Sequence, residues 1–297
     1  MADFRGFVAN CLLCGHETTP DPEGVLIPNL ITWNLNGYRV ELHQHPDVIR
    51  EKPQAFKNQF VRSTEVIVND VTDSNVEKVR NLVNDLCSLL SFASLSNVWC
   101  FASNYSGRTE GKSLWGKASY SRPTIDIRNG QIVHNFIEQT WPNYQKLKKR
   151  RKLQLVFRYL VEVHLEEQPV EIQLLLIFTA LECLKDTFAK EQRIPYARGF
   201  YRKISNPPKT DIAKEPTYKF EELLTLMLRE QKIRKGLKRS IQLRNDIIHS
   251  GVSRRPMRSL FKTRRECDEL VTIYLLKLLG YRGWYLCRTG LDRKKLG

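Results

Sequence analysis

The spacing of apolar residues changes along this 297-residue chain, and that change constrains its fold more than any other feature. Up to about residue 70, short runs with alternating apolar residues, such as Tyr38 to Leu42, stand between Gly, Pro and Asn residues, which is typical of strands. From Ser74 to about Leu95, and again after about Phe136, apolar residues recur every three or four positions, as in helices. We therefore predict an α+β protein, with a mixed, β-rich domain over residues 1–135 and an all-α helical bundle over residues 136–297.

Turn and cap residues place individual elements. Asn129-Gly130 predicts a hairpin turn inside a strand-like run from Thr124 to Val133. A Pro-containing loop is expected from Ile194 to Pro216. Five helices are expected in the second half, over about Leu153 to Leu165, Pro169 to Lys190, Phe220 to Gln231, Ile233 to Ser250 and Thr263 to Leu279.

Positive charge dominates the composition, because 48 Lys and Arg face 32 Asp and Glu and leave a formal charge of +16. A surplus of this size favours polyanionic partners such as nucleic acid or an anionic membrane face. The most apolar stretch, Leu174 to Leu181, is far shorter than the ~20 residues that span a bilayer, so we expect no membrane-spanning helix. The first residues lack a basic segment followed by an apolar one, and the seven cysteines are scattered, so we expect a cytoplasmic protein with reduced thiols.

The string from Leu243 to Gly251 carries the residues best suited to chemistry. Asn245 and His249 are four residues apart and share one helical face, whereas Arg244 lies about 140° round from His249 and must reach back with its long side chain. His249 falls in the last turn before the capping glycine, where the helix macrodipole favours the imidazolium. A cation, an amide and a titratable imidazole at one helix end could cleave RNA without a metal, through attack of the 2′-hydroxyl on the adjacent phosphate.

One protomer supplies a single histidine in this string, but in-line cleavage needs one group to remove a proton and another to donate one. Two copies related by a twofold axis would supply both, since isologous contacts place the same patch face to face. We therefore expect a homodimer through the C-terminal helices.

A second motif, Ile177 to Leu184, places Glu182 within a nearly unbroken apolar run, where an unpaired carboxylate is costly. Arg244 is the partner that we expect for it. The pair would either support an active site or serve only as a structural ion pair that aligns two helices.

Arg244, Asn245 and His249 resemble the Arg-Asn-x-x-x-His signature of the HEPN family (higher eukaryote and prokaryote nucleotide-binding domains). The motif from Ile177 to Leu184 resembles the apolar-Ala-Leu-Glu-x-Leu helix of the Apea-like branch of that family. The resemblance covers about residues 136–280 and implies a dimeric helical bundle. Many such proteins are metal-independent ribonucleases in antiviral defence or toxin–antitoxin systems. On this sequence the resemblance assigns the active groups to Arg244, Asn245 and His249, with Glu182 in support, and implies no cofactor.

Basic residues elsewhere suggest a path for RNA. The chain carries one run at Lys148, Lys149, Arg150 and Arg151, and further arginines follow the motif at Arg254, Arg255 and Arg258. These are expected to contact phosphates, although such runs are commonly just solvated helix faces.

Cys11 and Cys14 have the spacing of a zinc knuckle, and His43 or His45 could complete a set of ligands. No second Cys pair exists, so small buried or partly exposed thiols are the favoured interpretation and no metal is expected.

Three functions remain open on the sequence. The first is a homodimeric endoribonuclease that cuts single-stranded RNA or tRNA loops, with an N-terminal domain that regulates it or recognises a ligand or phage trigger. The second is a catalytically silent RNA- or nucleotide-binding module, and the third is an adaptor. The lack of a Gly-rich phosphate loop, a Gly-x-Ser-x-Gly elbow and clustered carboxylates disfavours kinases, hydrolases and metal-dependent nucleases.

Overall fold

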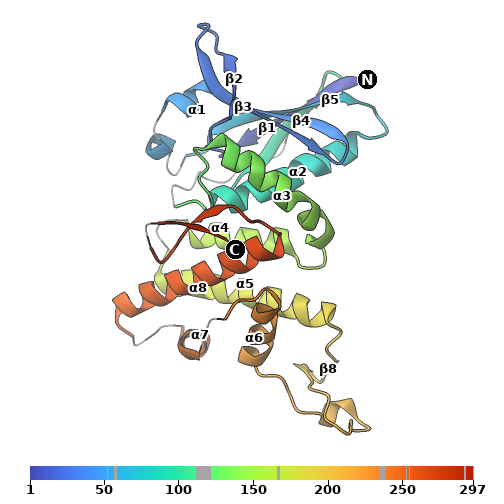
Figure 1. The fold of residues 1–297 in the computed structure, drawn as a ribbon, viewed down its shortest axis with the longest axis vertical. Helices are drawn as coiled ribbons and strands as arrows, with labels where there is room; N and C mark the ends of the chain where they lie inside the picture. Colours follow the sequence, from blue (N-terminus) through green and yellow to red (C-terminus); the bar gives the residue numbers. More distant parts are fainter. Residues whose placement is uncertain are drawn as a thin grey trace.

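A seven-stranded antiparallel sheet forms the first part of the molecule in a computed structural model of the chain (Figure 1). The strand order is β2-β3-β4-β5-β1-β6-β7. The strands are β1 (Ala2–Ala9), β2 (Glu17–Pro20), β3 (Leu26–Leu35), β4 (Tyr38–Gln44), β5 (Arg62–Val71), β6 (Trp99–Tyr105) and β7 (Arg108–Gly111). The structure describes residues 1–51, 53–56, 59–111, 122–165, 168–234, 238–251, 253, 255–290 and 292–296, and only the backbone of residues 53, 54, 238, 239, 249 and 250.

One face of the sheet is buried because apolar residues alternate along its strands. Trp33 of β3 lies opposite Val40 of β4, and Val40 lies opposite Val68 of β5, all fully or almost fully buried. Helices α2 (Val76–Ser94) and α3 (Gly130–Leu147) pack against the sheet, and the indole Nε1 of Trp33 donates to the carbonyl of His134 in α3 at 3.2 Å. A short helix, α1 (Pro46–Arg50), and a 3-10 turn, Pro53–Phe56, lie between β4 and β5.

The predicted hairpin at Asn129-Gly130 is wrong, because these residues begin α3. The side chain of Asn129 accepts a hydrogen bond from the backbone N–H of Ile132 at 3.2 Å and so acts as the N-cap. A Cβ on Gly130 would lie 2.2 Å from the backbone of Gly15. The same dipeptide that suits a tight turn is used here for a helix cap and for close backbone contact.

The second part of the chain is helical, as predicted, apart from two small hairpins. Helix α5 lies at the centre of this layer and packs against α4, α6, α7 and α8. The helices are α4 (Leu153–Val163), α5 (Val170–Glu191), α6 (Phe220–Glu230), α7 (Lys238–Ser250) and α8 (Met257–Leu278). The hairpins are β8 (Tyr196–Ala197) with β9 (Phe200–Tyr201), and β10 (Trp284–Leu286) with β11 (Arg293–Lys295), and a 3-10 turn spans Ile212–Lys214.

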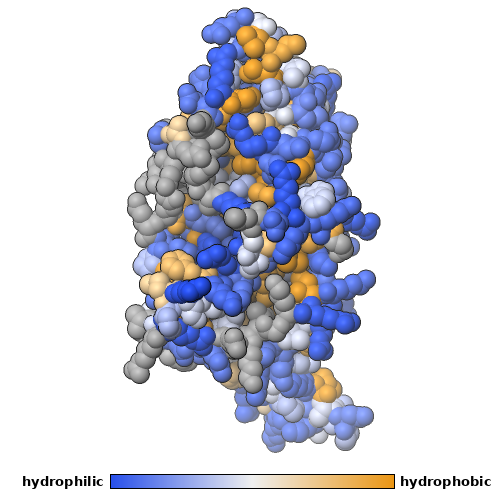
Figure 2. All heavy atoms as spheres, turned by 60° about the vertical axis from the view of Figure 1, so that its left-hand side comes forward, coloured by the Kyte–Doolittle hydropathy of each residue, from blue (hydrophilic) through white to orange (hydrophobic). Residues whose placement is uncertain are grey.

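The two layers share one continuous cluster of buried apolar side chains. Phe92 of α2 stacks on Phe157 of α4 with ring centroids 4.7 Å apart, and residue 136, the expected start of the second domain, lies inside α3. No helix in the described ranges is long and apolar enough to cross a bilayer. Figure 2 shows apolar atoms near the top of the molecule, at the height of the β2–β3 hairpin, and hydrophilic side chains over much of the helical half.

Candidate functional site

The contact between α5 and α7 positions the Arg244 motif. Leu243 and Ile247, one turn apart on α7, are buried, whereas Asn245 and Asp246 are exposed. Helix α7 therefore turns one apolar stripe towards the core and leaves its polar face open. Arg244 follows the buried Leu243 directly and lies at the edge of that stripe, so its side chain reaches across to α5.

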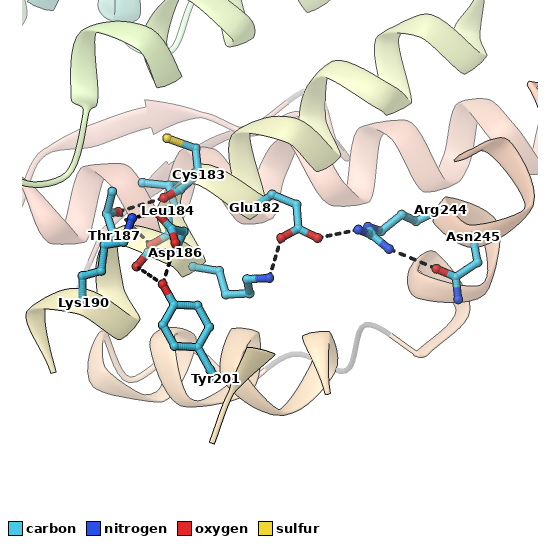
Figure 3. Close-up of polar contacts among 10 residues, drawn as sticks. Glu182, Cys183, Leu184, Asp186, Thr187, Lys190, Tyr201, Arg244 and Asn245 are labelled. Carbon is cyan, nitrogen blue, oxygen red and sulfur yellow. Dashed lines mark hydrogen bonds and ion pairs between the residues drawn. The ribbon is translucent and has the colours of Figure 1, made fainter. Parts of the chain in front are cut away.

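Glu182 of α5 receives that side chain. Arg244 Nη2 donates to Glu182 Oε1, Lys185 Nζ donates to Glu182 Oε2, and Arg244 Nη1 donates to Asn245 Oδ1 at 3.0 Å (Figure 3). The expected Glu182–Arg244 pair is thus confirmed. The side chain of Glu182 is 34% exposed and that of Arg244 21%, so the carboxylate lies at the edge of the core and not in the buried surroundings that its apolar neighbours suggested.

An aromatic ring completes the site. The guanidinium carbon of Arg244 lies 4.6 Å from the ring centroid of Phe220 in α6, and Lys185 Nζ lies 4.9 Å from the same centroid. Both cations therefore gain cation–π stabilisation. Sequence analysis did not single out Lys185 or Phe220. Lys185 could have been found as an (i, i+3) partner of Glu182, but nothing local marks Phe220 as a neighbour of Arg244.

The backbone of His249 lies where the sequence predicts it, in the last turn of α7. Gly251 ends the helix with a φ of +73°, and its N–H donates to the carbonyl of Ile247 at 2.8 Å. The side chain of His249 lies outside the described residues.

The basic run at residues 148–151 serves several purposes, and the RNA role expected for Arg151 is wrong. The Arg151 side chain is fully buried, donates to Glu191 at 3.0 Å and to the hydroxyl of Tyr274, and so joins α5 and α8 behind the α3–α4 turn. Its chemical surroundings explain the difference, since paired guanidinium groups tolerate burial and this one has partners on two helices. Lys148 is 22% exposed and pairs with Asp85 of α2.

The remaining basic candidates lie at the surface. Lys149 is exposed, Arg150 is half-exposed with Glu191 at 3.3 Å, and Arg258 is exposed near the start of α8. Arg255 lies 4.0 Å from Asp246 of α7, close to the motif. Arg254 lies outside the described residues.

The zinc candidates are buried thiols. Burial raises the pKa of Cys11 to about 12 and also raises the pKa of Cys14, so both thiols stay protonated at neutral pH. Nowhere in the described ranges do three or more His, Cys, Asp or Glu side chains come together as metal ligands could. His43 instead lies 3.0 Å from Glu41.

The α5–α7 contact thus brings together a held cation, an amide and, one turn further along α7, the backbone of a histidine. The guanidinium and the amide of this set can donate hydrogen bonds to an anion such as a phosphate. Comparison of the chain with protein-family models, with curated proteins and with solved structures gives no match.

Proposed function

We propose that this chain is a metal-independent endoribonuclease of the HEPN type that cuts single-stranded RNA or tRNA loops. The observation that carries the proposal is the ion pair between Arg244 and Glu182, because it holds the guanidinium beside Asn245, which lies one turn before His249. The resemblance of the two motifs to the HEPN family supports the same residues.

In the proposed reaction, Arg244 holds the scissile phosphate while the 2′-hydroxyl attacks it. His249 transfers protons, and its position in the last turn of α7 favours the imidazolium that can donate one. Arg244 and Asn245 stabilise the charge that develops on the phosphate, and Glu182 orients Arg244. The products are a 2′,3′-cyclic phosphate and a 5′-hydroxyl end.

The reaction needs two imidazoles, so we propose a twofold homodimer through the C-terminal helices. Three large apolar side chains support this surface, because Ile248, Met257 and Phe261 are 46%, 56% and 44% exposed at the end of α7 and the start of α8. Met257 and Phe261 are one turn apart on α8 and so share a face. Exposed apolar side chains that share one helix face, as these two do, favour a protein interface.

The biological setting is part of the proposal. All seven cysteines are free thiols, which supports a reducing compartment such as the cytoplasm. The sheet with α2 and α3 would regulate the nuclease or recognise a ligand or phage trigger, as in antiviral defence or a toxin–antitoxin system.

A silent RNA- or nucleotide-binding module is the second candidate, and one observation favours it. Both terminal nitrogens of Arg244 already donate, one to Glu182 and one to Asn245. If that arrangement persists when RNA is bound, Arg244 would contribute charge to binding and nothing to cleavage.

His249→Ala and Arg244→Ala separate the two candidates in a gel assay with purified protein and labelled RNA. For the nuclease, His249→Ala should lose at least about 10²-fold in cleavage rate with RNA affinity retained, because removal of a proton-transfer group costs that much. Arg244→Ala should lose cleavage and also bind RNA more weakly. Activity should persist in excess chelator, and His45→Ala, an exposed histidine near the sheet, should behave like the parent. Unchanged cleavage by His249→Ala would show that the cleavage comes from another source than this site and would leave the binding module as the function of the Arg244 motif.

A further inference from the structure

The segment between α5 and α6, residues 192–219, lies at the end of the molecule farthest from the sheet (Figure 1). It is strongly basic, with seven Lys and Arg residues against two Asp and Glu residues. All of its residues belong to the described part of the chain. Such a charge favours an anionic partner, and the aromatic residues of the segment indicate which kind.

Strands β8 and β9 form a tight hairpin near the start of this segment. The two residues of β8 pair with the two residues of β9, so only Arg198 and Gly199 form the turn. Both turn residues have positive φ, +51° and +81°, as a type I′ hairpin turn requires. The exposed side chain of Arg198 therefore lies at the tip of the hairpin.

Two exposed aromatic side chains flank that tip. Tyr196 is 63% exposed and Phe200 is 57% exposed. Tyr196 lies opposite Tyr201 in the ladder, whereas Phe200 lies opposite Ala197, so the two exposed rings occupy opposite faces of the hairpin. Each face of the hairpin thus presents one aromatic ring to a partner.

Both exposed rings are supported by buried side chains. The ring of Tyr196 contacts that of Tyr201 edge-on, with centroids 4.9 Å apart, and the guanidinium carbon of Arg202 lies 5.8 Å from the centroid of Phe200. Arg202 also donates to the carbonyl of Ala197 at 3.1 Å, which ties it to the other strand. Rings that are already held in place lose little conformational entropy when a ligand stacks on them.

The base of the hairpin is fixed to the helix that carries Glu182. The hydroxyl of Tyr201 donates to Asp186 Oδ1 at 2.5 Å, and its ring packs with Ala189 and Leu223 (Figure 3). Asp186 lies one turn after Glu182 on α5. A strand that binds the hairpin is therefore held beside the helix that positions Arg244.

Basic side chains continue from the hairpin onto the helical layer. Glu191, the last residue of α5, lies 3.3 Å from the half-exposed Arg150, and the exposed Lys149 precedes Arg150. The exposed Arg193 follows two residues after Glu191. The hairpin thus adjoins side chains that are expected to contact phosphates.

Single-stranded nucleic acid and an anionic lipid surface are the two partners that suit aromatic residues combined with arginine. When a segment enters a membrane, its apolar side chains lie deepest and its cations stay among the headgroups. The order is reversed in this hairpin, because Arg198 occupies the tip and both rings lie behind it. Nucleic acid fits this order, since bases can stack on the rings while the guanidinium contacts a phosphate.

We infer that the β8–β9 hairpin is an arm that binds single-stranded RNA, with Tyr196 and Phe200 stacking on unpaired bases and Arg198 contacting a phosphate. The inference rests on the proposed function, for which it names the surface that holds the substrate. Only unpaired bases can stack in this way, so the arm selects single strands and loops over duplexes.

Fluorescence anisotropy on the full chain tests the inference, with a labelled single-stranded 2′-O-methyl oligoadenylate as the probe. A strand without free 2′-hydroxyls cannot be cut by the proposed reaction, so binding is measured whether or not the chain is a nuclease. Tyr196→Ala and Phe200→Ala should each weaken binding at least about fivefold, because a stacked base is lost.

Matched variants identify the ring as the cause. Tyr196→Phe keeps the ring and removes only the hydroxyl, so it should bind like the parent. Trp284→Ala removes an aromatic side chain that is 49% exposed on β10, away from the arm in the sequence, and should also bind like the parent.

The salt dependence separates the two kinds of contact. Arg198→Gln should weaken binding and reduce the slope of the logarithm of affinity against the logarithm of salt by about 0.7, because one phosphate contact is lost. Tyr196→Ala should leave this slope unchanged, since stacking on a neutral ring releases no counterions.

Equal affinities of Tyr196→Ala and Trp284→Ala for the single strand would overturn the inference, and so would an equal loss on the same strand paired with its complement. Binding to vesicles of phosphatidylcholine and phosphatidylserine that depends on Tyr196, without binding to the strand, would identify a membrane contact instead. A chain that shows the expected losses but cuts no RNA would retain the arm and reject only the nuclease.

Discussion

Arg244 of α7 donates a hydrogen bond to Glu182 of α5 across 62 residues of sequence. The pair joins the two motifs on which the functional proposal rests, and it lies at the edge of the helical layer with both side chains partly exposed. A cation held in this way keeps its orientation but remains within reach of a ligand.

Glu182→Gln should affect activity more than stability. The ion pair is partly exposed, so we expect the free energy of unfolding to fall by less than about 1 kcal/mol. RNA cleavage should fall by about tenfold or more, because Arg244 loses the charge that orients it. Urea denaturation and a cleavage assay measure the two effects, with Glu171→Gln in the first turn of α5 as the control. A cleavage rate equal to that of the control would argue for a purely structural pair.

Arg151→Ala and Arg150→Ala should differ sharply in stability. Arg151 is fully buried between Glu191 and Tyr274, so its removal should lower the free energy of unfolding by about 3 kcal/mol. Arg150 is 50% exposed, so its removal should cost no more than about 1 kcal/mol. Chemical denaturation of both variants checks the contrast, and similar midpoints would contradict the structural role given to Arg151.

The stability of the protein should fall as pH drops below about 6.5, the ordinary pKa of histidine. The pKa of His164 is lowered by burial in the folded state, so the unfolded state binds the proton first and gains stability in acid. Asp268, whose folded pKa is also lowered, adds a separate loss only below its ordinary value of 3.8. His164→Gln should flatten the dependence between pH 7 and 5, measured by denaturation at each pH. His45→Gln should keep the parent's slope.

Phe261→Glu should convert the proposed dimer into a monomer, because it places a charge on the helix face that Phe261 shares with the exposed Met257. Sedimentation velocity at micromolar concentration measures the change, and RNA cleavage should be lost with the dimer. Trp284→Glu, at an exposed position on β10, should leave both unchanged. A parent protein that cleaves RNA as a stable monomer would rule out the shared active site.

RNA affinity should depend steeply on salt. Each phosphate contact to single-stranded RNA releases counterions, so the logarithm of affinity should fall by about 0.7 per contact for each tenfold rise in salt. Arg258→Gln and Lys149→Gln should each remove one phosphate contact and so reduce this slope by about 0.7. Fluorescence anisotropy from 50 to 300 mM salt measures the slope. An unchanged slope in both variants would place the RNA path elsewhere.

The sequence by itself determined the features that depend on neighbours along the chain. Period-two alternation marked the strand-rich half, three-to-four spacing marked the helices, and Gly251 marked the end of α7. The cost of an unpaired carboxylate among apolar residues was enough to predict a partner for Glu182.

Only the tertiary structure decided which distant groups meet. Asn129-Gly130 suits a turn and a helix cap equally well, and the contact of Gly130 with Gly15 selected the cap. A run of basic residues looks uniform in the sequence, yet Arg151 is buried because Glu191 and Tyr274 receive its donors. Local patterns fix the period and polarity of an element, whereas the burial of a charge depends on partners that packing alone brings within reach.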